Sequence, residues 1–152
     1  MIFSATTLHG LRAVSLLVGR PGETALGREL AAELGVPSEY LLKVLARLAR
    51  AGVLRARSGR AGGYRLARPA ARIRVGEVVR PLEGVRTRPG CLLRPGRRCS
   101  ARRGCPAHAA WSAVTTAYLA FLEEATVADL GVGSLTVGER GGRRPRPPRR
   151  RG

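Results

Sequence analysis

Residues 24–67 place two short helical patterns directly before a glycine-rich hairpin pattern, and this order constrains the fold more than any other feature. In the first helical pattern leucine repeats every fourth residue, at Leu26, Leu30 and Leu34. This spacing puts the leucines on one face of a helix. Gly35 follows and supplies a sharp turn into the second pattern. Two helices joined by a tight glycine turn are therefore predicted.

The second helical pattern carries an apolar stripe and a basic stripe on different faces. The apolar positions are Leu41, Val44 or Leu45, and Leu48. The basic positions, spaced i, i+4 and i+7, are Lys43, Arg47 and Arg50. Thr24 and Ser38 are predicted to be the N-caps of the two helices, and Gly52 is predicted to end the second one.

Residues 53–57 and 63–67 are predicted to pair as two short strands around a tip that contains Gly59, Arg60 and Gly62. A helix-turn-helix followed by a basic hairpin is a winged helix. In such a domain the second helix enters a major groove, while the hairpin carries arginine to phosphates or to a neighbouring minor groove. The predicted fold class is mainly α with this one small β-hairpin.

The residues predicted to contact DNA lie on the second helix and on the hairpin. They are Ser38, Tyr40, Lys43 and Arg47 of the helix, and Arg57, Gly59, Arg60, Gly62 and Gly63 of the hairpin. The glycines are expected to act through their backbone. For Tyr40, packing between helices is an equally good interpretation.

The chain has 28 basic and 10 acidic residues, a net charge of +18. Residues 139–152 hold seven arginines and one glutamate, so most of the excess lies in the rest of the chain. A folded body this basic favours a polyanionic partner, most often nucleic acid. A basic surface inherited from composition is the alternative. No apolar run is long enough to span a membrane, so a cytoplasmic protein is expected.

The rest of the chain divides by composition. Residues 73–82 are predicted to form a short strand and a helical turn. Residues 107–130 are predicted to form a long helix with Trp111, Val114, Tyr118, and Phe121 or Leu122 on one side. So much aromatic surface favours a dimerisation helix, with packing inside one chain as the alternative. The predicted units are a winged-helix domain (1–82), a cysteine loop (83–106), a dimerisation helix (107–130) and a disordered basic tail (131–152).

All three cysteines lie close together, as Cys91-x7-Cys99-x5-Cys105, and His108 follows three residues later. The loop between them is rich in Gly, Pro and Arg and has few apolar anchors, so it needs a ligand to hold it. Thiolates suit iron–sulfur clusters and zinc, and the neighbouring arginines favour deprotonated thiols. An iron–sulfur cluster is the favoured interpretation; zinc and metal-free redox thiols stay open.

Residues 37–69, the three-cysteine loop and the closing residues 126–130 together resemble the bacterial iron–sulfur winged helix-turn-helix regulators of the IscR/NsrR family. The resemblance implies a homodimer whose long helices cross and which binds palindromic sites in double-stranded promoter DNA. It implies a regulator, expected to be a repressor, whose DNA affinity changes with the state of its cluster. It implies neither an enzyme, nor a small-molecule substrate, nor a membrane partner.

The resemblance also implies a ligand set. Cys91, Cys99 and Cys105 match the three cluster thiolates, and His108 matches the fourth ligand of the IscR-like branch, which favours 2Fe–2S over 4Fe–4S. In the other branch the fourth ligand can be an acidic residue near the N-terminus of the partner subunit. Residues 6–10 contain no acid, which favours His108 and leaves His9 as a weaker donor.

Three features depart from the family pattern. The first cysteine gap is seven residues rather than five, and the basic residue of the hairpin tip falls two positions later, at Arg60. Leu42 lies near the position at which IscR has a specificity-setting glutamate. The operator sequence is therefore not carried over. A different class also stays open, a metal-binding interaction protein that does not bind DNA. No catalytic triad, nucleotide loop or carboxylate pair is present, so an enzyme is not expected.

Overall fold

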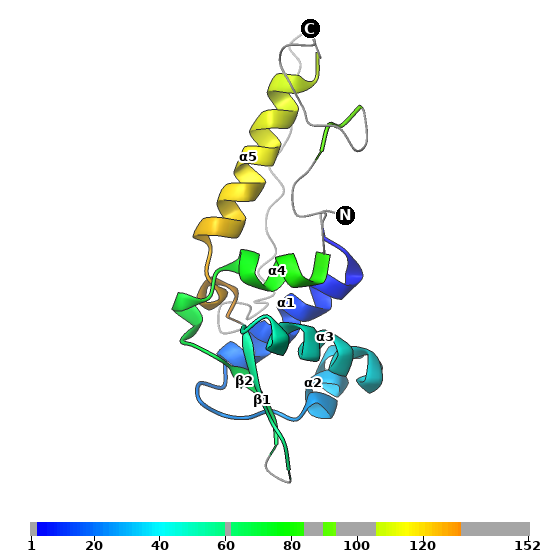
Figure 1. The fold of residues 1–152 in the computed structure, drawn as a ribbon, viewed down its shortest axis with the longest axis vertical. Coiled ribbons are helices and arrows are strands. Elements are labelled where there is room, and N and C mark those ends of the chain that lie inside the picture. The colour runs from blue at the N-terminus through cyan, green and yellow to red at the C-terminus, as the bar shows by residue number, and fades with distance from the viewer. Residues whose placement is uncertain (1–2, 60–61, 84–89, 94–105, 132–152) are drawn as a thin grey trace, which may run out of the picture.

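The computed structural model describes residues 3–59, 62–83, 90–93 and 106–131. The elements, in order, are α1 (Ala5–Val18), α2 (Gly27–Leu34), α3 (Ser38–Arg50), β1 (Leu54–Arg57), β2 (Gly63–Leu66), the 3₁₀ turn η1 (Ala70–Arg72), α4 (Val75–Glu83), α5 (His108–Glu124) and the 3₁₀ turn η4 (Val127–Leu130). The fold is mainly helical with one two-stranded antiparallel hairpin, as predicted (Figure 1). No helix in the described ranges is long and apolar enough to cross a membrane.

The turn between α2 and α3 depends on Gly35. Its φ of +67° lies in the left-handed region, which glycine adopts at little cost, and its amide donates to the carbonyls of Ala31 and Ala32 at the end of α2. The apolar stripe of α3 is buried as expected and consists of Leu41, Val44, Leu45 and Leu48. The predicted helix-turn-helix is confirmed.

The predicted N-cap at Thr24 is wrong, because the next residue, Ala25, pairs with the hairpin and is not helical. The Tyr64 amide donates to the Ala25 carbonyl at 2.8 Å, and the Ala25 amide donates to the Tyr64 carbonyl at 3.0 Å. Ala25 is therefore extended and extends the small sheet by one residue, so α2 begins only at Gly27. This bridge fastens the base of the hairpin to the connection between α1 and α2.

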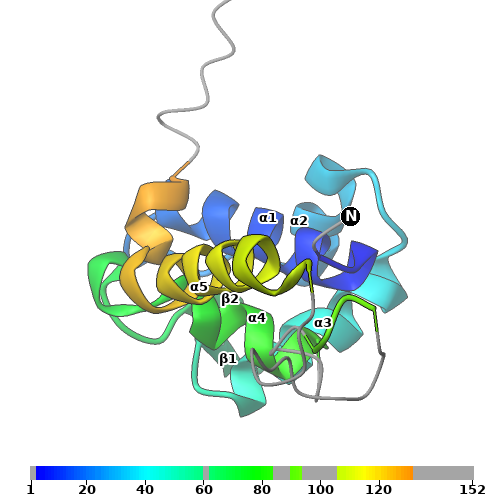
Figure 2. The ribbon, with the colours of Figure 1, turned by 90° about the horizontal axis from the view of Figure 1, so that it is seen from above.

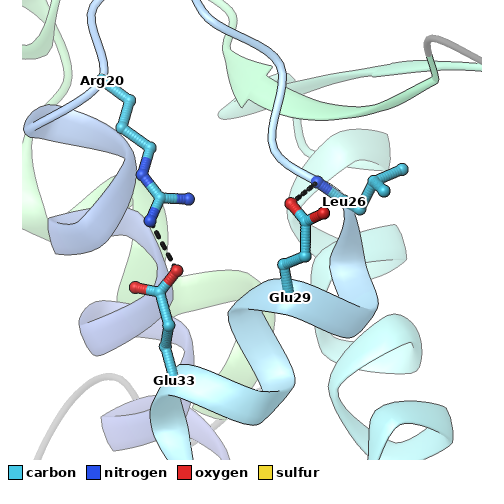
Figure 3. A network of polar contacts seen from close by, with 4 residues as sticks. All are labelled: Arg20, Leu26, Glu29 and Glu33. Atoms are coloured by element: carbon cyan, nitrogen blue, oxygen red, sulfur yellow. Dashed lines mark hydrogen bonds and ion pairs between the residues drawn. The ribbon is translucent and has the colours of Figure 1, made fainter.

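Two acidic residues of α2 secure that connection (Figure 3). The Glu29 carboxylate accepts a hydrogen bond from the Leu26 amide at 3.4 Å, which satisfies a backbone donor at the start of the helix. Glu33 forms an ion pair with Arg20, which lies just after α1. The pair is exposed, so it adds orientation rather than much stability.

The predicted N-cap at Ser38 is wrong by one residue. Pro37 is extended and its carbonyl accepts the first helical hydrogen bond, from the Leu41 amide at 3.1 Å. Ser38 is thus the first residue of α3. At the other end the prediction is confirmed, because Gly52 follows the cap residue Ala51 with a φ of +75°.

α1 lies in the middle of the main core and contacts α2, α3, α4 and η4. The short strand predicted at the start of residues 73–82 is reduced to an isolated bridge between Arg74 and Thr126, while α4 is longer than the predicted helical turn and continues through Pro81. Its buried residues follow a helical period and are Val75, Gly76, Val78, Val79 and Leu82. Gly10 of α1 permits close approach, because a Cβ at this position would lie 2.3 Å from the Leu82 Cδ1 atom. The helix therefore belongs to the body of the winged helix.

The predicted helix over residues 107–130 is interrupted after Glu124. Ala125 is extended, and its carbonyl accepts from the Val75 amide at 2.9 Å. Val127 then donates to the Ile73 carbonyl at 2.8 Å, so this stretch pairs with the chain that leads into α4. Val127 is fully buried in the main core. The pairing explains the break, and it fixes the C-terminal end of α5 to the body.

α5 rises from the body as an arm, with its N-terminal end at the far tip (Figure 1). Seen from above, it crosses over α4, which it contacts (Figure 2). Leu122 is its single buried residue and packs with Val75 and Val79 of α4. The first three turns of α5 are covered only in part by the described residues: the rings of Tyr118 and Phe3 lie 5.9 Å apart between centroids, whereas Val114 stays exposed.

Candidate DNA-binding surface and cysteine loop

The outer face of α3 holds the predicted DNA contacts that point away from the body. Lys43 is exposed and makes no hydrogen bond or ion pair to a described residue. Ser38 is half-buried at the start of the helix. Leu42 is 38% exposed and lies over Gly27 of α2, where an added Cβ would be 2.5 Å from the Leu42 Cδ2 atom. Lys43 thus presents on this face a cation without a partner among the described residues, and Leu42 presents an apolar side chain.

Tyr40 points inward and joins α3 to α1. Its hydroxyl donates to the Thr6 Oγ1 atom at 3.2 Å and lies 3.1 Å from the His9 Nδ1 atom. The rings of His9 and Tyr40 meet edge to face, with centroids 5.6 Å apart. The structure thus gives Tyr40 the inter-helix contact that the sequence left open. A direct DNA contact for this residue stays a prediction.

Arg47 also turns inward, toward the C-terminal end of α4. Its Nη2 atom donates to the carbonyls of Pro81 at 2.6 Å and Leu82 at 3.3 Å. A cation is favourable there because the last carbonyls of a helix carry partial negative charge. The basic stripe of the sequence therefore divides: Lys43 and Arg50 are exposed and have no partner among the described residues, whereas Arg47 is engaged. The role of Arg47 at DNA stays a prediction.

The hairpin shows why its tip contains glycines. Gly59 has a φ of +97°, and its carbonyl oxygen accepts a hydrogen bond from the Gly62 amide at 2.8 Å. Gly63 has a φ of +141°, and a Cβ there would lie 2.4 Å from the Ala25 oxygen. These positions thus have a conformational reason to be glycine, and their contact with DNA stays a prediction. Arg57 is exposed, and Arg60 lies outside the described residues.

The cysteine loop is described only at its two ends. Cys91 is half-buried, His108 is the first residue of α5, and Cys99 and Cys105 lie outside the described residues. The Trp111 Nε1 atom donates to the Gly90 carbonyl at 2.7 Å. That bond brings Gly90, the neighbour of Cys91, to the N-terminal end of α5, which begins at His108. The first and the fourth predicted ligands therefore lie near the same end of this helix. Apart from the presence of a tryptophan, no sequence pattern indicated this hydrogen bond.

The start of the loop is held from a second side. The Ser4 amide donates to the Glu83 carboxylate at 2.7 Å, so the chain before α1 contacts the last residue of α4. With the Arg47 bonds to Pro81 and Leu82, this contact fastens the point at which the chain leaves α4. Neither contact could be predicted from residue spacing, because both join segments far apart in sequence.

No group of three or more metal-binding side chains occurs within the described ranges. The predicted set can therefore be judged only by its chemistry. Cys91 and His108 supply a thiol and an imidazole, which are suitable donors for an iron–sulfur cluster or zinc. The N-terminal end of α5 carries partial positive charge, which favours thiolates and an anionic cluster. The described residues fit such a group.

α5 exposes apolar side chains along its length. Val114 is 56% exposed and Phe121 is 42% exposed, one on either side of the half-buried Tyr118. Burial raises the pKa of Tyr118, and the nearby Glu83 carboxylate raises it further. Exposed large apolar groups in a row are typical of an interaction surface.

Comparison with known proteins agrees with this architecture. Residues 3–132 match the family described as Rrf2, iron-dependent transcriptional regulator. The structure resembles CymR (YrzC), the global cysteine regulator of B. subtilis, with a TM-score of 0.70, 23% identity and coverage of 86% of this chain and 96% of that one. For IscR from T. potens the TM-score is 0.64 and the identity 26%, covering 84% of this chain and 83% of that one.

The oxidized form of CymR from Staphylococcus aureus is similar to the same degree, with a TM-score of 0.64 and 26% identity over 86% of this chain and 95% of that one. The family match covers most of the chain, and the helix-turn-helix and wing provide its DNA-binding elements. The chain therefore belongs to the Rrf2 family, and it is a winged-helix transcriptional regulator that binds DNA rather than an enzyme.

Proposed function

We propose that this regulator is a homodimeric repressor whose DNA affinity depends on a 2Fe–2S cluster held by Cys91, Cys99, Cys105 and His108. The observation that carries the proposal is the fastening of the loop on two sides. Arg47 of α3 holds the chain where it leaves α4, and Trp111 of α5 holds the backbone beside Cys91. A change in the conformation of the loop can therefore reach α3 and α5 through the covalent chain and through these hydrogen bonds.

The dimer is supported by the surface of α5. Val114 and Phe121 are exposed, whereas a helix that served one chain alone would bury its apolar side. A second copy of the same helix is a fitting partner, since most soluble oligomers are symmetric homodimers. The two α3 helices of such a dimer, related by a twofold axis, would each bind one half-site of a palindromic site.

The cluster, when bound, would supply a redox-labile anionic centre at the N-terminal end of α5. Arg47 is the positioning residue, because its two hydrogen bonds to α4 fix one end of α3 relative to the loop. Tyr40 fixes the other end of α3 to α1 through Thr6 and His9. A loop that is braced or relaxed would bias the position of α3 and so the DNA affinity.

The cluster is tested by purifying the full chain anaerobically and measuring its visible absorption together with iron and sulfide. We expect a coloured protein with about two irons and two sulfides per chain. Cys99→Ala and Cys105→Ala should lose both the colour and the iron, while Ser100→Ala, which changes the same loop without removing a ligand, should keep them. A colourless wild-type protein would overturn the cluster.

A thiol-based regulator with the same fold is the second candidate. It is favoured by the similarity to CymR from Staphylococcus aureus, whose structure was determined in an oxidized form. In that case the protein would contain neither iron nor zinc, and an oxidant would change the DNA affinity of the wild type but not of the triple cysteine variant. One zinc per colourless chain would instead indicate a structural metal site.

A further inference from the structure

A pocket of about 430 Å³ lies at the base of the hairpin, away from the outer face of α3. The end of α1 contributes Leu17 and Val18, and the segment after β2 contributes Leu66 and Pro69. The volume falls in the range of sites for small ligands. The pocket therefore has an apolar wall that can cover a small apolar group of a ligand.

Two arginines of the hairpin line the same pocket and face each other across the sheet. Arg55 of β1 and Arg65 of β2 are register partners, and both are exposed. Side chains that are directly opposite in an antiparallel pair lie within contact distance, and like charges there are destabilising. Neither arginine forms a hydrogen bond or ion pair with a described residue. The two guanidinium groups thus have no counter-charge within the part of the chain that the structure describes.

The other two arginines of the pocket differ in this respect. Arg20 is paired with Glu33, and Arg68 is paired with Glu77. Burial raises the pKa of Glu77, but hydrogen bonds from the Arg68 side chain and the Arg74 amide lower it by more, so the carboxylate stays charged. The positive charge left unbalanced in the pocket therefore belongs to Arg55 and Arg65.

We propose that the pocket binds an oxyanion, a phosphate or carboxylate, attached to a compact apolar group. A pair of guanidinium groups is suited to an oxyanion, because each presents several N–H donors in a planar fork. Leu17 and Leu66 would cover the apolar part of the ligand. The anion would relieve the repulsion between Arg55 and Arg65 and join the hairpin to the end of α1. The anion has two sources, a free small molecule or a backbone phosphate of bound DNA.

The test titrates the full chain, without DNA, with phenyl phosphate and separately with inorganic phosphate, while NMR follows the backbone amides of Leu66 and Ala67. We expect saturable shifts with phenyl phosphate and weaker binding of inorganic phosphate, which cannot use the apolar wall. Replacing both Arg55 and Arg65 by alanine should weaken phenyl phosphate binding at least roughly tenfold. The matched control replaces Arg28 and Arg72, two exposed arginines outside the pocket, by alanine.

Equal weakening in the two double variants would overturn the site, because binding would then follow net charge alone. Arg65→Glu provides a second variant, since a carboxylate opposite Arg55 should stabilise the hairpin and abolish anion binding. Phenyl phosphate binding that persists beside saturating DNA identifies a free small molecule as the source. Displacement by DNA, with a salt slope lowered by about 0.9 per lost phosphate contact in the double alanine variant, identifies a DNA phosphate.

Discussion

α3 and α5 are both rich in apolar residues, but they differ in how much of their apolar surface is buried. α3 buries four side chains against α1, α2 and α4 and exposes its polar face. α5 is longer, yet it buries only Leu122. The winged-helix body is thus complete within one chain, whereas the arm is incomplete. Under the proposed function this difference separates two tasks, with DNA binding on the body, subunit association on α5 and the cysteine loop between them in sequence.

The largest effect should come from a cavity in the body. Leu45 of α3 is fully buried, so Leu45→Ala should lower the free energy of unfolding by about 2–5 kcal/mol. Val114→Ala, on the exposed arm, should change the unfolding of the dissociated chain very little. Denaturant unfolding at low protein concentration compares the two. Equal losses would mean that the arm is as much a part of the single-chain core as α3.

The next effect concerns the arm. Replacing both Val114 and Phe121 by glutamate should convert the protein to a monomer and weaken DNA binding about 100-fold, because two half-sites would no longer be bound together. Sedimentation and fluorescence anisotropy measure the two changes. Thr116→Glu, an exposed position elsewhere on α5, is the control and should remain a dimer. A variant that stays dimeric would place the interface off α5.

A smaller effect should separate the two basic residues of α3. Lys43→Ala should weaken binding and lower the slope of log affinity against log salt by about 0.9, since one phosphate contact is lost. Arg47→Ala should weaken binding without changing that slope, because its guanidinium is engaged by Pro81 and Leu82. A lowered slope for Arg47→Ala would show that it reaches phosphate when DNA is bound.

The smallest effect concerns the joint between arm and body. Hydrogen bonds from the Thr126 amide and hydroxyl lower the pKa of Asp129 below its ordinary range. Its carboxylate therefore contributes stability above the unfolded pKa of about 3.9, and this contribution is lost as the pH falls through the lower, folded value. The melting temperature of Asp129→Asn should be slightly lower than that of the wild type at neutral pH and equal to it in strong acid. A difference that persists in strong acid would contradict this role.

The sequence predicted the body well because its signals are local. Leucine spacing and Gly35 located the helix-turn-helix, and the glycines at the tip located the hairpin. The errors arose where distant segments pair. Ala25 is extended by Tyr64, which displaces the start of α2, and Val127 pairs with Ile73, which ends α5 early.

For the candidate site, the sequence identified residue types better than directions. The basic spacing on α3 did not reveal that Arg47 turns toward α4, because helical period alone cannot tell which partner a long side chain meets. Tyr40 posed the same problem, and its contact with His9 decided the orientation. The ligand set depends on Cys99 and Cys105, which lie outside the described residues, so it stays a prediction.

The proposed function requires that the cysteine loop and the DNA-binding body are coupled. The most direct measurement is the dissociation constant of the full-length protein, with and without its cluster, for one palindromic DNA that the protein itself selects from random sequence, at fixed salt. We expect the two constants to differ by about fivefold to 100-fold, the usual range of coupling between sites. Equal constants for the two forms would contradict the coupling.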